Sequence, residues 1–177
     1  FGGRKNSGTE DAIFALEHWT RAKWWEGKVV AGLFLDVKSA YPSVHPARLI
    51  KYLYQLKCPT YLVLIIEDFL KKRSTTIRLD DFTSDAFEID IGLPQGSPLL
   101  VILYIIYNNS LLNPSFSVLE DTVSIGYVDD VVHLVAARSL DEAQEGLRYE
   151  GIRSLEWGVT HGAIFDQAKA QFLWLMK

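Results

Sequence analysis

The first 36 residues combine one helical pattern with one continuous apolar run. After a Gly-rich loop at residues 1–8, apolar side chains recur at helical spacing, which predicts a helix that ends near Glu26 and is capped by Ser7 or Thr9. The apolar positions that would form its buried face are Ile13, Leu16, Trp19 and Trp24. The run KVVAGLFLD at residues 28–36 is almost entirely apolar, so it predicts a central strand buried on both faces.

Proline residues then separate two shorter helical patterns. Pro46 suits the first turn of a helix over residues 46–57, and the pair Cys58-Pro59 interrupts the pattern before a second helix over residues 60–73. The cations that end this second helix suit its C-terminal dipole. Residues 74–92 alternate on both sides of the segment DDFTSD, which predicts a hairpin.

The second half of the chain continues with a helix, a hairpin, another helix and a strand. The first of these helices runs from Ser97 to about Leu112; its ten-residue apolar run at 98–107 is half of what crosses a bilayer, so we expect a buried helix and no membrane partner. A hairpin is predicted over residues 122–137, a helix over 140–157 with Leu140, Ala143, Leu147 and Ile152 on one side, and a strand over 170–176. Helices packed on one face of an antiparallel sheet make the predicted class α+β.

Composition limits what the chain can be. Its 177 residues suit one domain, and a hydrophobic share of 49% is enough to bury a core, which excludes a disordered chain. The single cysteine, Cys58, excludes an internal disulfide and a zinc site built from several cysteines. Because the chain begins at Phe1 and its only methionine is Met176, we expect it to be a fragment of a longer reading frame.

The net charge of −4 by itself argues against a nucleic-acid partner, but the charge is unevenly distributed. Residues 1–78 carry 13 Lys and Arg against 7 Asp and Glu, whereas residues 79–177 carry 5 against 15. Such an asymmetry between halves indicates a polyanionic or cationic partner.

Three aspartates stand where an apolar strand ends or turns. Asp36 closes the run VVAGLFL, and Asp129 and Asp130 lie at the tip of an otherwise apolar hairpin. Two adjacent carboxylates between β-branched residues are locally unfavourable, which suggests a function. If the strands are neighbours, the carboxylates would bind hard divalent cations. Alternatively, Asp129-Asp130 is an ordinary polar turn and Asp36 an ordinary strand end.

Five segments in order resemble the reverse transcriptase family along nearly the whole chain. FLDVKSAY (34–41), GLPQGSPL (92–99) and YVDD (127–130) are similar to the first palm carboxylate motif, the nucleotide loop and the double-aspartate motif of that family. FGGRKNSGTEDAI (1–13) resembles the finger segment that precedes the palm in non-LTR retrotransposons, and FDQAKAQFLWL (165–175) resembles the lysine-bearing motif. The narrower resemblance is to LINE-type elements of fungi. The family resemblance implies that residues 1–177 are a fragment of a reverse transcriptase domain. Residues 1–30 would be a fingers segment, and residues 31–177 would be the palm with a fingers insertion.

The resemblance assigns the acidic residues and one lysine to catalysis. Asp36, Asp129 and Asp130 would bind two Mg²⁺ ions, for which Mn²⁺ is the expected substitute, and Asp130 would be the least essential ligand. Lys169 matches the lysine that acts near the pyrophosphate as a general acid; the alternative is a solvated surface lysine. The family's hydroxyl and acid after this lysine are replaced here by Ala170 and Gln171.

The resemblance assigns four further residues to the incoming nucleotide. Tyr41 matches the aromatic gate that rejects a ribose 2′-hydroxyl, although it could instead be a core aromatic. The backbone from Val37 onward would lie near the triphosphate. Gln95 and Gly96 would contact nucleotide and template, and glycine there allows a close approach of the backbone. Without the other motifs, the sequence PQG would indicate only a turn.

The implied protein is the palm of a right-hand polymerase with an RNA template, a DNA primer and dNTP as partners. The cations placed near nucleic-acid phosphates are Arg4, Lys5, Arg21, Lys23, Lys71, Lys72, Arg73 and Arg78. The alternatives are an inactive retroelement remnant that keeps the palm fold and, as a lesser reading, a palm polymerase such as a group II intron maturase. The family implies a location in cytoplasm and nucleus, and the sequence itself specifies none.

Overall fold

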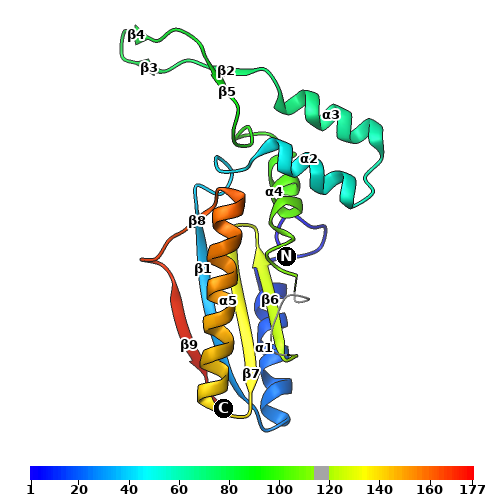
Figure 1. Cartoon of the computed structure of the whole chain (residues 1–177), viewed down its shortest axis with the longest axis vertical. Helices are drawn as coiled ribbons and strands as arrows, with labels where there is room; N and C mark the ends of the chain where they lie inside the picture. Colours follow the sequence, from blue (N-terminus) through cyan, green and yellow to red (C-terminus); the bar gives the residue numbers. More distant parts are fainter. Residues whose placement is uncertain (114–119) are drawn as a thin grey trace. The chain divides into compact units, whose positions relative to one another are not determined.

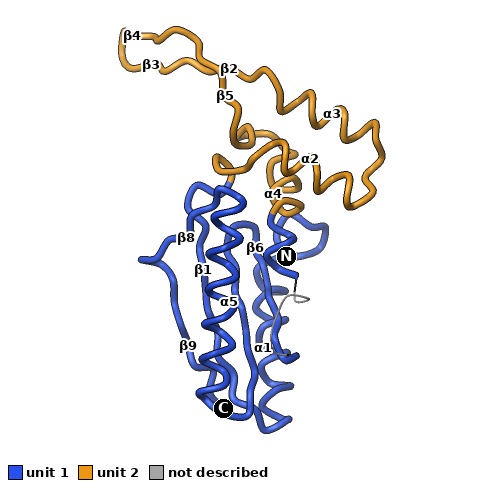
Figure 2. Tube along the Cα trace, in the orientation of Figure 1, with its two compact units in different colours: residues 1–40, 108–177 blue, residues 41–107 orange. Residues whose placement is uncertain are grey.

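The computed structural model describes residues 1–113 and 120–177, which form two compact units. Unit 1 comprises residues 1–40 and 108–177, and unit 2 comprises residues 41–107 (Figure 2). Among the described helices, none combines the length and hydropathy that a membrane span requires.

Unit 1 is built on an antiparallel sheet whose centre is β1 (Val29–Lys38). On one side β1 pairs with β7 (Asp130–Ala137), which pairs in turn with β6 (Thr122–Tyr127). On its other side β1 pairs with β8 (Ile164–Phe165) at Val37 and Lys38 and with β9 (Gln171–Leu175) from Val30 to Phe34. The predicted central strand and the predicted hairpin over 122–137 are therefore confirmed.

Helices cover both faces of this sheet, whereas one covered face was expected. α5 (Leu140–His161) covers one face of the sheet (Figure 1), and its Ala143 and Leu147 pack there with Ala31 and Val135. α1 (Thr9–Trp25) packs on the opposite face, against Val132 and Leu134. Because side chains alternate along a strand, β7 supplies apolar residues to both layers and reads as a nearly continuous apolar run.

Unit 2 consists of helices and two short strand pairs. It contains α2 (Pro46–Gln55), α3 (Thr60–Leu70) and α4 (Leu100–Asn108), the last residue of which belongs to unit 1. Instead of one continuous hairpin over 74–92, β2 (Arg73–Thr75) pairs with β5 (Phe87–Ile89), and β3 (Arg78–Leu79) pairs with β4 (Phe82–Thr83). The ladder is interrupted where Ser84 accepts a hydrogen bond from the Ile77 amide, which replaces a strand contact.

Several helix boundaries and faces differ from the prediction. Gly8 caps α1 in place of Ser7 or Thr9, and its amide donates to the Asp11 carboxylate at 2.6 Å. Ile13 is 65% exposed, so its place in the core was wrong. α5 continues to His161 because Gly162, at φ 69°, supplies the left-handed residue that ends a helix; Leu140 and Ile152 on this helix are exposed.

Candidate active site

Two of the three predicted aspartates face each other across neighbouring strands. The pairing of β1 with β7 places Asp36 directly opposite Asp130, at the end of an eight-pair ladder that runs from Val29 opposite Ala137. Directly opposite residues on paired strands present their side chains to the same face of the sheet. Asp36 shares this face with Phe34, which contributes to the apolar layer beneath α1.

Asp129 occupies the connection between β6 and β7. Tyr127 pairs with Asp130, so Val128 and Asp129 form a two-residue turn. Val128 has a φ of 58°, which is a strained value for a β-branched residue. Across residues 1–113 and 120–177, no three His, Cys, Asp or Glu side chains gather closely enough to hold a metal ion. Asp36 and Asp130 thus form a facing pair, and Asp129 is adjacent to it in the turn.

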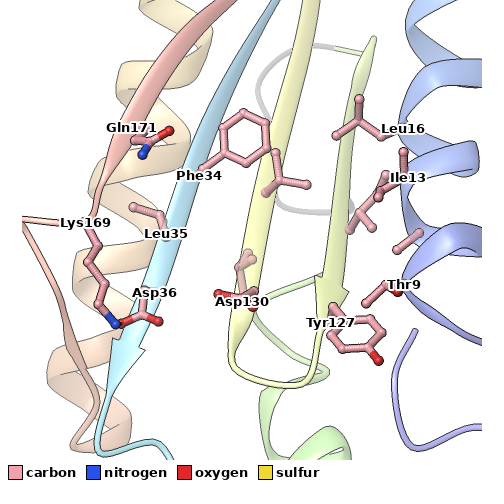
Figure 3. Close-up of a pocket in the computed structure, with 14 residues that line it drawn as sticks. Thr9, Ile13, Leu16, Phe34, Leu35, Asp36, Tyr127, Asp130, Lys169 and Gln171 are labelled. Atoms are coloured by element: carbon pink, nitrogen blue, oxygen red, sulfur yellow. The ribbon is translucent and has the colours of Figure 1, made fainter.

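Lys169 completes the charge arrangement at this end of the sheet. Its ammonium donates to the Asp36 Oδ2 atom at 3.0 Å, and about 63% of its side chain is exposed (Figure 3). The segment before it is anchored on β1, because the Asp166 amide donates to the Asp36 carbonyl at 2.8 Å and the Asp166 carboxylate pairs with Lys38. The sequence places Asp166 in the lysine-bearing segment but gives no sign of this anchoring role.

The electrostatics of the site reflect crowded carboxylates. Partial burial, followed by the charges of Asp129 and Asp36, raises the pKa of Asp130 above its ordinary value. The hydrogen bond to Asp36, followed by its charge, raises the pKa of the Lys169 ammonium, which therefore stays protonated at neutral pH. The site concentrates negative charge that one lysine offsets in part.

A pocket of about 560 Å³ opens beside the facing aspartates, between α1 and the sheet. Figure 3 shows Asp36 and Lys169 on one side of it and Thr9, Ile13 and Leu16 of α1 on the other. Its walls are mainly apolar away from the aspartates. A concave site with apolar walls and a few convergent charged groups is suited to bind a ligand.

The residues of unit 2 that are predicted to bind the nucleotide lie on two loops that are hydrogen-bonded to each other. The Leu93 amide donates to the Tyr41 carbonyl at 2.9 Å, and the Tyr41 ring meets the buried ring of Tyr104 edge-on, with centroids 5.2 Å apart. Gly92, at φ 84°, leaves no room for a Cβ, which would lie 2.9 Å from the Pro42 carbonyl oxygen. Within unit 2, the segment at Tyr41 and Pro42 is thereby fastened to the loop that continues to Gln95.

Gln95 and Gly96 are exposed, and Gly96 has a φ of 89° with open space around its Cα. Both are accessible to a ligand of unit 2. Val37 is 3% exposed and pairs with Phe165 of β8, so its side chain belongs to the core and only its backbone can serve a ligand.

Several of the predicted phosphate-binding cations have local acidic partners. Arg21 pairs with Glu17, Lys71 pairs with Glu67, and Lys23 bridges Glu26 and Asp121. The Arg73 side chain donates to the Leu70 and Ile91 carbonyls. At those positions the side chains therefore already take part in ion pairs or hydrogen bonds within the chain.

Comparisons with known sequences identify one family. A family model described as reverse transcriptase (RNA-dependent DNA polymerase) matches residues 1–174. The RNA-directed DNA polymerase from mobile element jockey of Drosophila melanogaster is 30% identical over 84% of this chain, and the probable RNA-directed DNA polymerase from transposon X-element of the same species is 28% identical over 71%. The chain spans 16% and 14% of these two relatives. Neither relative tests the expected fungal origin.

Comparisons with solved structures identify the fold. Telomerase from Candida tropicalis in complex with a TWJ fragment of telomeric RNA has a TM-score of 0.73 and 15% identity over 97% of this chain, which covers 30% of the telomerase chain. The apo form of that telomerase has a TM-score of 0.73 and 16% identity, again over 97% of this chain and 33% of the other. The likeness confirms the α+β fold of a right-hand polymerase palm.

Proposed function

Because the chain belongs to the reverse transcriptase family, we propose that it is the catalytic core of an RNA-directed DNA polymerase that extends a DNA primer on an RNA template. In this reaction the primer 3′-hydroxyl oxygen forms a bond to the α-phosphorus of a dNTP. The bond from that phosphorus to the bridging oxygen breaks, pyrophosphate leaves, and the hydroxyl proton is lost. The observation that carries the proposal is the facing pair of Asp36 and Asp130, next to Asp129, in a chain with the family's ordered motifs.

The acidic residues fit a divalent cation by their chemistry. Their carboxylate oxygens are hard ligands. Burial, followed by the charges of Asp129 and Asp36, raises the pKa of Asp130, and a bound cation would offset both effects. Asp36 and Asp130 would hold Mg²⁺, or Mn²⁺ in its place, and Asp129 would have to move in from the turn to join them, since the described residues contain no ready three-residue cluster. Two bound ions would stabilise the charge on the attacking and leaving oxygens.

The other predicted residues act on the nucleotide. Lys169, protonated beside the carboxylates, would donate a proton to the departing pyrophosphate. The Tyr41 ring, backed by Tyr104, would press on the sugar at C2′ and exclude a hydroxyl. Gln95 and Gly96 would contact nucleotide and template through an open loop, and the backbone at Val37 would approach the triphosphate.

The test is primer extension by the parental polypeptide that contains this chain. Asp129→Asn should reduce incorporation of dNTPs on an RNA template to background, because the amide is neutral and a weaker oxygen donor. Asp141→Asn, the same change at an exposed residue of α5, should keep wild-type activity. Wild-type incorporation by the Asp129→Asn enzyme would refute the proposed site. An inactive remnant, the alternative, predicts no incorporation by the unmodified parent.

A further inference from the structure

The turn that carries Asp129 adopts a conformation that its own residues disfavour. Val128 has a φ of 58°, in the left-handed region where a β-branched side chain is strained. A two-residue hairpin turn with positive φ at its first residue normally has glycine there. Contacts from outside the hairpin must therefore hold this turn.

Two contacts meet Val128 from segments distant in sequence. The Nδ2 atom of Asn108 donates to the Val128 carbonyl oxygen at 3.3 Å. On another side lies the backbone of Gly2, where a Cβ would stand 2.8 Å from the Val128 Cγ2 atom and 3.3 Å from its nitrogen. The first contact fixes the peptide plane between Val128 and Asp129, and the second restrains the Val128 side chain.

Asn108 is a buried polar residue, and its hydrogen bond to the Val128 carbonyl is what its burial has to be weighed against. It ends α4 with only 2% of its surface exposed, and in the described chain its Oδ1 atom has no hydrogen-bond partner. Burying an amide with one unpaired oxygen is costly, and leucine at this place would avoid the cost. The hydrogen bond that the Asn108 side chain donates to the Val128 carbonyl therefore explains why asparagine is found here. That carbonyl belongs to the turn that carries Asp129, a predicted metal ligand.

We propose that Asn108 is a positioning residue of the polymerase site, which holds Val128 in the left-handed conformation and thereby directs Asp129. This inference rests on the proposed polymerase function. It assigns no contact between Asn108 and substrate, because the amide acts only through the Val128 carbonyl.

The first arm of the test is spectroscopic and independent of activity. A φ near 60° brings the amide and α protons of one residue close together, so Val128 in the isotope-labelled 177-residue chain should give a strong NOE between them. Asn108→Leu and Asn108→Asp should weaken this NOE, the second more strongly because it sets a carboxylate against the Val128 carbonyl. Asn109→Leu, at the exposed neighbouring residue, should leave it unchanged, and circular dichroism checks that all variants fold.

The second arm measures primer extension by the parental polypeptide. Asn108→Leu should lower kcat by about tenfold with little change in the KM for dNTP, as expected for the loss of one hydrogen bond that orients a catalytic group. Val128→Gly should restore most of the activity to the Asn108→Leu enzyme, because glycine adopts positive φ without strain.

The results separate this inference from the proposed function. An unchanged NOE in both Asn108 variants, or a weakened NOE with unchanged kcat, overturns the positioning role. Failure of the rescue by Val128→Gly also overturns it, because Asn108 would then act other than through the turn. An active Asp129→Asn enzyme overturns the proposed function, while the NOE still decides whether Asn108 holds the turn.

Discussion

At the scale of single residues, Asp36 receives hydrogen bonds on both its backbone and its side chain. Its carbonyl accepts from the Asp166 amide at 2.8 Å, and its carboxylate accepts from Lys169 at 3.0 Å. The backbone contact fixes the strand, whereas the lysine occupies an oxygen that a metal ion would need. In this arrangement Lys169 and a bound cation compete for the same carboxylate.

Removal of the lysine charge should therefore strengthen metal binding. We expect Lys169→Met to raise the affinity of the chain for Mn²⁺ by about two- to fivefold, because the contribution of an exposed ion pair is small. Electron paramagnetic resonance of free Mn²⁺ measures the affinity. Lys38→Met removes an equal charge from a lysine that pairs with Asp166 instead, and should have a smaller effect. An equal gain in both variants would show that overall charge, and not competition at Asp36, is responsible.

Tyr41 carries a separate prediction about sugar selection. Tyr41→Val should allow the parental enzyme to incorporate ribonucleotides, because the smaller side chain leaves room for a 2′-hydroxyl. The ratio of kcat/KM for dNTP to that for rNTP measures this and should fall. Tyr54→Val, at a half-exposed tyrosine of the same unit, is the matched control. Unchanged discrimination would leave Tyr41 as a packing partner of Tyr104 only.

The sequence indicated which residues to examine but not how they meet. Asp36 faces Asp130 because of the register between β1 and β7, and a strand without apolar-polar alternation does not specify its register. The contact of Lys169 with Asp36 depends on how the segment after β8 crosses β1. Asn108 gave no signal at all, since a buried polar residue at a helix end looks like an exposed one until packing is known.

At the scale of elements, α5 is joined to the sheet by a buried polar network. His133 of β7 is fully buried and hydrogen-bonded to Ser124 at 2.7 Å and Ser154 at 2.9 Å. Beneath it the Glu150 carboxylate lies 3.8 Å away and pairs with Arg153 at 2.6 Å. Burial, and secondarily the charge of Arg153, lowers the pKa of His133 to about 3.

This network predicts a loss of stability in acid. With a pKa of 6.5 unfolded and about 3 folded, His133 binds a proton only in the unfolded state between these values. Stability is therefore unaffected above pH 6.5 and falls as the pH drops below it, by about 2 kcal/mol at pH 5. Urea unfolding at about pH 7 and pH 5 measures how much stability each protein loses in acid, and wild type should lose more than His133→Gln. If the two proteins lose equal stability, His133 is not the group responsible.

The network also explains why helix faces were partly mispredicted. Hydrophobic periodicity correctly placed Ala143 and Leu147 in the core, but it cannot detect buried polar residues such as Glu150 and Ser154. It favoured Ile152 instead, which is 43% exposed. Element types were largely predictable because strand runs and helix-breaking residues are local signals, whereas the face of a helix is decided by what it packs against.

At the scale of the whole molecule, the chain is a small part of the proteins it resembles. It spans between 14% and 19% of the length of the similar mobile-element polymerases from Drosophila. The assignment of residues 1–30 to fingers and 31–177 to palm stays a prediction, since the compact units divide at other residues. Length and composition correctly indicated a chain the size of one domain with enough apolar residues for a core. They could not indicate the division into two units, because long-range contacts define that division.

The net charge leads to the last prediction, which concerns the isolated chain. A chain of charge −4 gains little overall attraction to a nucleic acid, and Arg21, Lys23 and Lys71 are already paired with carboxylates. We therefore expect the 177 residues alone to bind an RNA–DNA duplex weakly and to show little or no primer extension, even with Mg²⁺ present. The parental polypeptide should extend the same primer under the same conditions.

Fluorescence anisotropy of a labelled duplex over a series of salt concentrations measures the binding, and the parental Asp129→Asn enzyme gives the background for extension. A shallow dependence on salt in the isolated chain and a steep one in the parent would place most phosphate contacts outside these residues, because each neutralised phosphate adds to the slope. Robust extension by the isolated chain would instead show that its own cations leave their carboxylate partners to bind the duplex.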